Sequence, residues 1–265
     1  MLHVLRSELT RLGQRRVLLA WFGLTALFAI MVNTVMASVV TSASMGDLPS
    51  PGVTFPTLAE LQAPSGLVAG VSSAVNLLGV VTLSMWAILT AQDHSTGLIR
   101  LLVAAEPRRW RLLAGKVVAL TLVTALVALV GVVANIFAAG PTMAAAGVDT
   151  SAWGTDLPAV LWSGWSNLFL ALSVWGVLGL LLATLTRSAA ASISIGVAYV
   201  LLVESMIRMA DGVPTDWLLG STLGAIARGG TAAVSYGAAL TLGVGDVIVA
   251  LAVAGFVFAR RDVTE

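Results

Sequence analysis

Few residues of this chain could do chemistry, and those that stand out are polar side chains inside long apolar segments. If those segments cross a membrane, such groups are functional candidates, because ionisable and amide groups are costly in lipid. For the amides, hydrogen bonding between helices is the alternative, and we favour it over ligand binding. The candidates for a translocation path are Asn33, Asn76, Asn135, Asn167 and Asp246.

Glu204 and Arg208 also lie in an apolar segment, four residues apart. Side chains at this spacing share one helix face, so an ion pair within the helix can satisfy both charges. We predict that this pair is structural and takes no part in selecting a transported molecule. Arg228, in the segment before the last apolar stretch, is the expected partner of Asp246.

Several kinds of active site are absent from the sequence. Gly115 and Lys116 match the end of a phosphate-binding loop, but Val117 replaces the required Ser or Thr and Trp110 replaces the first glycine. His3 and His94 have no spacing typical of metal ligands, and the chain has no Cys. We therefore predict no catalytic residues, no metal and no cofactor in this chain, which is not itself expected to be an enzyme.

Composition indicates the class of protein. Hydrophobic residues make up 58% of the chain and charged residues only 10%, with a mean hydropathy of +0.98. Too little polar surface remains for a soluble domain, so we predict an integral membrane protein. The 8 Trp and 26 Gly fit this class, since Trp gathers at headgroup level and Gly lets membrane helices approach closely.

The apolar stretches predict an all-α, polytopic fold with six transmembrane helices in one domain over residues 1–265. The expected spans cover about 17–40, 67–91, 112–139, 158–186, 189–209 and 238–259. Before the first span, leucines at helical spacing with charges on the other faces, Glu8 and Arg11 among them, predict an interfacial amphipathic helix. A signal peptide is the alternative, but 17–40 is uncharged and long enough to span.

A shorter helix is expected before the last span. Residues 215–227 are mostly apolar, with Thr215 as a cap and Gly229 and Gly230 as a stop. About thirteen residues cannot cross a bilayer, so this helix is predicted to be re-entrant or to lie at the outer interface.

Basic residues set the orientation. Of the 14 Lys and Arg residues, all but Arg208 and Arg228 fall on one side of a six-span arrangement. Lys and Arg near span ends are retained in the cytoplasm. We therefore expect a multi-pass protein of the cytoplasmic (plasma or cell inner) membrane with both termini cytoplasmic.

The largest polar stretch between two spans covers residues 92–116. Within it, Leu98, Leu101 and Leu102 recur at helical spacing, Ser95 or Thr96 can cap the start, and Pro107 prevents continuation. The pattern predicts one short amphipathic helix over 96–105, about 15 Å long and therefore on or outside the membrane. Its arginines can also act as lipid-headgroup anchors.

The order of an acidic residue, Gly97, a short apolar helix, Glu106-Pro107-Arg108-Arg109 and then Lys116 resembles the permease subunits of type-2 ATP-binding-cassette (ABC) exporters. The six spans and the flanking helices extend the resemblance over the whole chain. The family often has Glu where Asp93 stands, which is a departure at the docking contact. The resemblance assigns ATPase coupling to Asp93, Gly97, Leu98, Arg100, Leu101, Leu102, Glu106, Pro107, Arg108 and Arg109.

The resemblance implies the membrane subunit of an ATP-driven exporter whose cytoplasmic helix docks on a separate ABC ATPase. Two ATPase subunits, a second permease copy in a homodimer or related heterodimer, and membrane lipid are the implied partners, with ATP and Mg²⁺ bound by the ATPase and no nucleic acid. An ion-gradient-driven secondary transporter and a non-transporting membrane anchor or immunity factor are the alternatives. The secondary transporter would require an ion-binding group near the bilayer midplane.

Overall fold

The chain folds as a bundle of long helices. The structure, a computed structural model, describes residues 7–8, 10–11, 15–41, 55–97, 109–209 and 214–260. Within these ranges all regular structure is helical, and six helices are long and apolar enough to cross a membrane. An all-α, polytopic membrane protein was predicted, and this class is confirmed.

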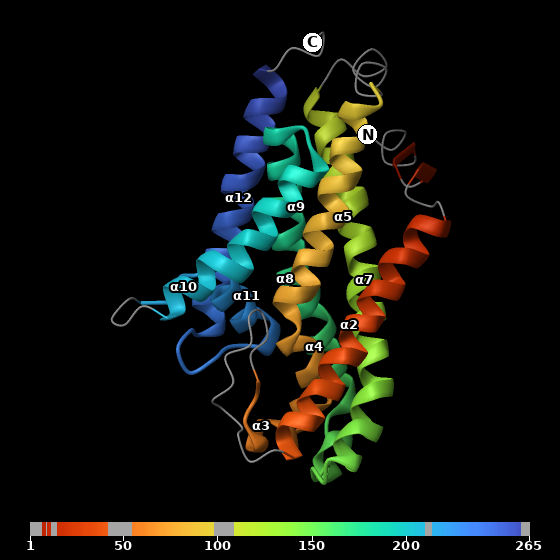
Figure 1. Ribbon diagram of the computed structural model, residues 1–265, viewed down its shortest axis with the longest axis vertical. Coiled ribbons are helices and arrows are strands. Elements are labelled where there is room, and N and C mark those ends of the chain that lie inside the picture. The colour runs from red at the N-terminus through yellow and green to blue at the C-terminus, as the bar shows by residue number, and fades with distance from the viewer. Residues whose placement is uncertain are drawn as a thin grey trace.

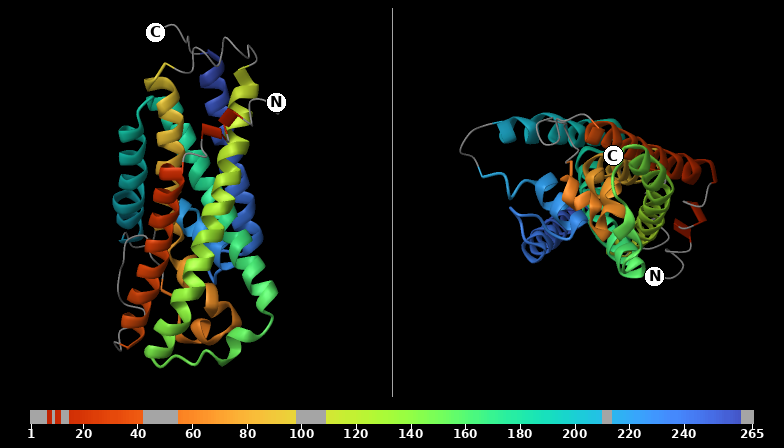
Figure 2. Two further views of the ribbon diagram at one scale, coloured as in Figure 1. Left: turned by 90° about the vertical axis from the view of Figure 1, so that its right-hand side faces the viewer. Right: turned by 90° about the horizontal axis from the view of Figure 1, so that it is seen from below.

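The six long segments agree with the predicted spans at most of their ends. They are α2 (Arg15–Thr41), α5 (Val75–Ser95), α7 (Arg109–Ala145), α8 (Leu157–Thr186), the continuous segment of α9 (Ala189–Ala198), η3 (Tyr199–Val203) and α10 (Glu204–Met209), and α12 (Tyr236–Arg260). Figure 1 shows α5, α7 and α12 reaching the same end of the bundle. In the end-on view of Figure 2, α2 and α7 lie on one side and α12 on the other.

The predicted second span, 67–91, begins too early. In the structure this part of the chain is divided into α3 (Leu58–Gln62), the 3₁₀ helix η1 (Pro64–Val68), α4 (Ala69–Ser73) and only then α5. The reason is a tight turn, in which a Cβ atom on Gly66 would overlap the Leu61 carbonyl. The Trp153 Nε1 group donates to that same carbonyl oxygen over 2.8 Å. Trp153 comes from the 3₁₀ helix η2 (Ser151–Gly154), which covers this end of the bundle.

Helices α5 and α8 form the centre of the bundle through glycine and tryptophan pairs. The Trp175 ring of α8 fills the space that a side chain on Gly79 would occupy, and the Trp86 ring of α5 does the same at Gly176. Trp86 also donates through Nε1 to Thr124 Oγ1 of α7 over 2.9 Å. Large rings against glycines hold two backbones close together, which is a common way to pack helices in lipid.

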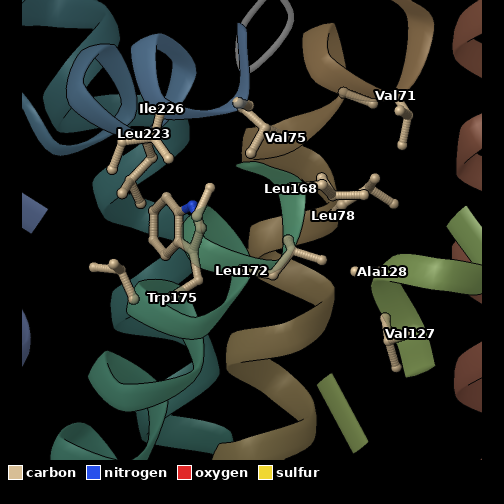
Figure 3. Packing of buried hydrophobic residues seen from close by; sticks show 14 of the residues in the cluster. Val71, Val75, Leu78, Val127, Ala128, Leu168, Leu172, Trp175, Leu223 and Ile226 are labelled. Atoms are coloured by element: carbon tan, nitrogen blue, oxygen red, sulfur yellow. The ribbon is translucent and has the colours of Figure 1, made fainter. Parts of the chain in front are cut away.

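Buried aliphatic side chains from five helices surround this centre. Figure 3 shows Leu168, Leu172 and Trp175 of α8 facing residues of α4, α5 and α7, with Leu223 and Ile226 above them. The last two residues come from α11 (Leu219–Arg228), and both are almost completely buried. The short helix before α12 is therefore part of the packed core.

Helix α11 corresponds to the short helix predicted over 215–227, but it begins at Leu219 because Leu218, in extended backbone conformation, occupies the N-cap position in place of Thr215. It ends at Gly229, whose φ of 75° is the left-handed conformation that favours glycine at a helix C-terminus. Ten residues cover about 15 Å, so α11 cannot cross a bilayer by itself.

Candidate functional site

Four charged side chains meet at the end of the bundle where α5 ends and α7 begins. Asp93 of α5 accepts from Arg11 Nη2 over 2.5 Å and pairs with Lys116 Nζ of α7, also over 2.5 Å. Glu8 pairs with Arg11 over 2.9 Å and lies 3.8 Å from Lys116. We call Glu8, Arg11, Asp93 and Lys116 the charge cluster.

Three members of the charge cluster are largely buried, whereas the Arg11 side chain is 36% exposed, and the charges of the cluster are balanced. The side chains of Asp93 and Glu8 are 5% and 6% exposed, and that of Lys116 is 10% exposed. Two carboxylates face two cations, so each buried charge has an opposite partner, as burial requires. Burial acts to lower the pKa of Arg11, but the hydrogen bond and charge of Asp93, with a contribution from Glu8, raise it above its usual value.

The charge cluster joins three segments of the chain. Lys116 also donates to the Leu89 carbonyl oxygen over 3.0 Å, so one side chain of α7 contacts α5 at two points. Arg11 bonds the N-terminal segment to the same carboxylate. Helices α5 and α7 bracket residues 98–108, which lie outside the described part of the chain. The charge cluster therefore links both helices that flank this connection to the N-terminal segment.

Several sequence predictions fall on this connection. Leu98, Arg100, Leu101, Leu102, Glu106, Pro107 and Arg108 lie outside the described residues, and Arg109 is the first residue of α7. The predicted start at residue 96 is wrong, because α5 continues through Ser95 and Thr96 Oγ1 donates back to the Gln92 carbonyl. Gly97 has a φ of 67° and takes the left-handed conformation that ends a helix. Any helix in this connection starts after Gly97.

Three members of the charge cluster were not predicted as site residues. Glu8 was predicted only as one of the charges on the other faces of the N-terminal amphipathic helix, and the structure buries it, with 5% of the residue exposed. The available signal was Lys116, an isolated cation inside the predicted third span, which needs an acidic partner. Asp93 was predicted, and it is the acid that contacts both cations.

The asparagines of the apolar segments have different surroundings. Asn33 Nδ2 donates to Asn135 Oδ1 over 2.8 Å, and Asn135 Nδ2 donates to the Leu67 carbonyl over 2.7 Å. Both side chains are buried, and together they connect α2, α7 and η1. A Cβ atom on Gly70 would come within 2.5 Å of the Asn33 amide, so a larger residue there would have to displace the bonded asparagines. This geometry is typical of hydrogen bonding between helices.

Glu204 holds the start of α11. Its Oε1 atom accepts from the Gly220 backbone N–H over 2.6 Å, while Arg208 Nη2 lies 3.8 Å from the same oxygen. The predicted ion pair is present at that longer distance, but the shorter bond to α11 was not predicted. Asn76 is nearby on α5, and its Nδ2 atom reaches the Gly220 carbonyl only over 3.5 Å. Negative charge near a helix N-terminus is favourable.

Removing the Glu204 carboxylate should destabilise the fold more than removing the Arg208 charge. Glu204→Ala leaves the buried Gly220 N–H without its acceptor, which costs about 1 to 3 kcal/mol. Arg208→Gln loses a long contact from an exposed side chain, worth no more than about 1 kcal/mol. Unfolding of the purified protein by SDS titration measures both. Equal losses for the two variants would contradict this ranking.

A cavity of about 460 Å³ lies beside α11. Figure 1 shows α11 in the half of the bundle away from the charge cluster. Asn167 lines it, and its Oδ1 atom accepts from the Tyr236 hydroxyl over 2.7 Å. Arg228 also lines it and donates through Nε to the Gly224 carbonyl of its own helix over 3.4 Å. The expected pair of Arg228 with Asp246 is therefore wrong within the described structure, because Arg228 folds back along α11 toward the cavity.

A family model describing proteins of unknown function, DUF2705, matches residues 26–264. The chain belongs to the DUF2705 family. A search of curated proteins finds no match. The DUF2705 match includes Asp93 and Lys116 of the charge cluster and begins after Glu8 and Arg11. The family description states no activity.

Proposed function

We propose that this protein is the membrane-spanning subunit of an ABC exporter and that residues 98–108 dock on a separate ATPase subunit. The observation that carries the proposal is the charge cluster, which bonds the two helices on either side of this connection to each other and to the N-terminal segment. If a partner protein pushes on this connection, the two helices that flank it, α5 and α7, must move together to transmit the displacement. The order of residues from Asp93 to Lys116, which resembles the coupling loop of such permeases, also supports it.

The coupling works through rigid contacts. ATP binding closes the ATPase pair and displaces the docked connection, and Asp93 and Lys116 make α5 and α7 follow as a unit. Helix α5 is packed against α8 through Trp175 on Gly79 and Trp86 on Gly176, so α8 moves with it. Packed helices of this kind change between discrete arrangements and open a path on one side or the other.

The remaining assignments follow from this role. The protein lies in the cytoplasmic membrane with both termini in the cytoplasm, works with a second permease copy, and leaves ATP and Mg²⁺ to the two ATPase subunits. The N-terminal segment lies at the cytoplasmic interface and α11 is re-entrant from the opposite side. Asn167 on the cavity and Asp246 on α12 are candidates for the path, whereas Asn33 and Asn135 act in packing.

The test is to co-express the chain with the ABC ATPase encoded in an adjacent reading frame and to measure co-purification. Burying a Leu is worth about 1.5 to 3 kcal/mol, so Leu101→Ser with Leu102→Ser should weaken ATPase binding by at least about a hundredfold. Losing the charge of Arg108 or Arg100 alone should weaken it far less, because exposed charges contribute little.

Membrane insertion is the control for each variant. The chain has no Cys, so a single cysteine at Thr150 reports insertion by labelling from one side. A correctly inserted Leu101→Ser, Leu102→Ser protein that binds the ATPase normally would contradict the docking role. If instead the arginine variants insert poorly and the leucine variants behave as the parent protein does, the connection is a lipid anchor.

A further inference from the structure

The cavity beside α11 lies near the ends of two helices that are long and apolar enough to cross a membrane. Figure 1 places α11 and the far end of α10 at the height where α12 begins. Two membrane-crossing segments, ending at Met209 and starting at Tyr236, therefore have their boundary there. The cavity is lined by residues from η1, α4, α8, α10 and α11, and hydroxyl and charged groups are frequent among them.

Two arginines face this cavity with incomplete partners. Arg228 makes only the long bond to Gly224 within its own helix, and in the described ranges no carboxylate lies within 4.0 Å of it. Arg208 is 3.8 Å from Glu204, whose oxygen is already bonded to Gly220 over 2.6 Å. The guanidinium groups of both arginines therefore have several N–H donors that are free to bind a further acceptor.

The charge on Arg228 is poorly compensated. Burial lowers its pKa, the charge of Glu60 raises it, and the charge of Arg208 lowers it again. Glu60 lies at the cavity as well, but its Oε2 atom accepts from the backbone N–H of Thr57 over 2.7 Å. An anion between the two arginines would relieve this imbalance.

One buried neutral donor in the cavity wall also has no hydrogen-bond partner in the described structure. It is the Ser73 hydroxyl, and only 3% of that residue is exposed. Asn167 accepts through Oδ1 from Tyr236, and its Nδ2 group is a further donor at the cavity. Buried polar groups are almost always hydrogen-bonded, so an unpaired donor in a cavity wall indicates a missing acceptor.

We propose that this cavity binds a phosphate group. Guanidinium groups recognise phosphate through paired N–H bonds, and a tetrahedral oxyanion has enough oxygens for two arginines as well as Ser73 and Asn167. A carboxylate has only two oxygens to offer. The phosphate belongs to a lipid headgroup or is free phosphate, and Glu60 and Asp216 on the cavity lining suit a headgroup that also carries an amine. This site is independent of the exporter proposal.

Binding to purified protein in uncharged detergent tests the proposal. The probes are inorganic phosphate, dihexanoylphosphatidylethanolamine, and dihexanoylglycerol as the analogue without phosphate, each titrated by calorimetry. The parent protein should bind a phosphate-bearing probe, and Arg228→Gln should weaken that binding about ten- to a hundredfold. Arg208→Gln should weaken it in the same direction. Arg260→Gln is the matched control, since it removes the same charge at the opposite end of the bundle.

The outcomes separate the two sources. Binding of the phospholipid but not of inorganic phosphate assigns a headgroup, and binding of inorganic phosphate that the phospholipid cannot displace assigns free phosphate. Either result supports the site if only the Arg228 and Arg208 variants lose it. Equal loss in Arg260→Gln, equal binding of dihexanoylglycerol, or no binding of either phosphate probe would overturn the proposal. Circular dichroism and gel filtration establish that each variant is folded.

Discussion

Replacing Gly179 by alanine should destabilise the protein by about 3 kcal/mol, because this position has no room for even one methyl group. A Cβ atom there would overlap the carbonyl oxygen of Leu83 and lie 3.0 Å from its Cα atom. These atoms belong to the backbone of α5, which cannot turn aside as a flexible side chain would. Helices α5 and α8 would have to separate, and the contacts of Trp86 and Trp175 with the facing glycines would be lost.

The free energy of unfolding by SDS titration measures this effect, and Gly23→Ala is the matched control. Gly23 lies in α2, and a Cβ atom on it would meet nothing within 4 Å. Since alanine has a higher helix propensity than glycine, the control should be as stable as the parent protein or slightly more stable. A similar loss in both variants would mean that any Gly to Ala change in this bundle is harmful and that the close approach at Gly179 is unimportant.

The long helices could be predicted from the sequence because a single property determines them. A segment that crosses a bilayer must be apolar over about 20 residues, and that pattern is visible without knowledge of any contact. The prediction failed where a contact decides the local structure. The break before α5 depends on Trp153 bonding to Leu61, two residues that come from separate short helices, η2 and α3.

The charge cluster could be predicted only in part, for the same reason. Asp93 was recognised from its place in the connection between two spans, but its partners lie far from it in sequence. Arg11 precedes Asp93 by 82 residues. Amphipathic spacing placed Glu8 on a polar face, and this spacing cannot show that another helix end covers that face.

The cavity depends on still more distant relations. Tyr236 and Asn167, which are bonded to each other beside it, are 69 residues apart. Arg208 and Arg228 were identified as the two basic residues on the other side of the membrane, and Asn167 as a polar group in an apolar span, and these are the sequence signals for this site. The predicted partner of Arg228 was wrong because the direction of its side chain is set by α11, whose position in the core is not encoded in any local pattern.

Replacing Lys116 by methionine should destabilise the fold by about 3 to 5 kcal/mol, the usual cost of removing one partner from a buried ion pair. Methionine keeps much of the length and the apolar stem, so packing changes little. The loss is electrostatic, because Asp93 and Glu8 would then share only Arg11, and one buried negative charge would remain without a partner. The hydrogen bond to the Leu89 carbonyl would also be lost.

Adding a second substitution shows whether Lys116→Met destabilises the fold through lost charge balance or because no change is tolerated at this position. Asp93→Leu combined with Lys116→Met removes one charge of each sign and leaves Arg11 paired with Glu8 over 2.9 Å, so it should recover most of the lost stability. Arg260→Met is the control, because it removes an exposed cation at the same end of the bundle and should have little effect. Stability is measured by SDS titration, and hydrogen exchange at residues 7–11 reports whether the N-terminal segment stays bound. If the double variant is no more stable than Lys116→Met alone, charge balance is not what holds these three segments together.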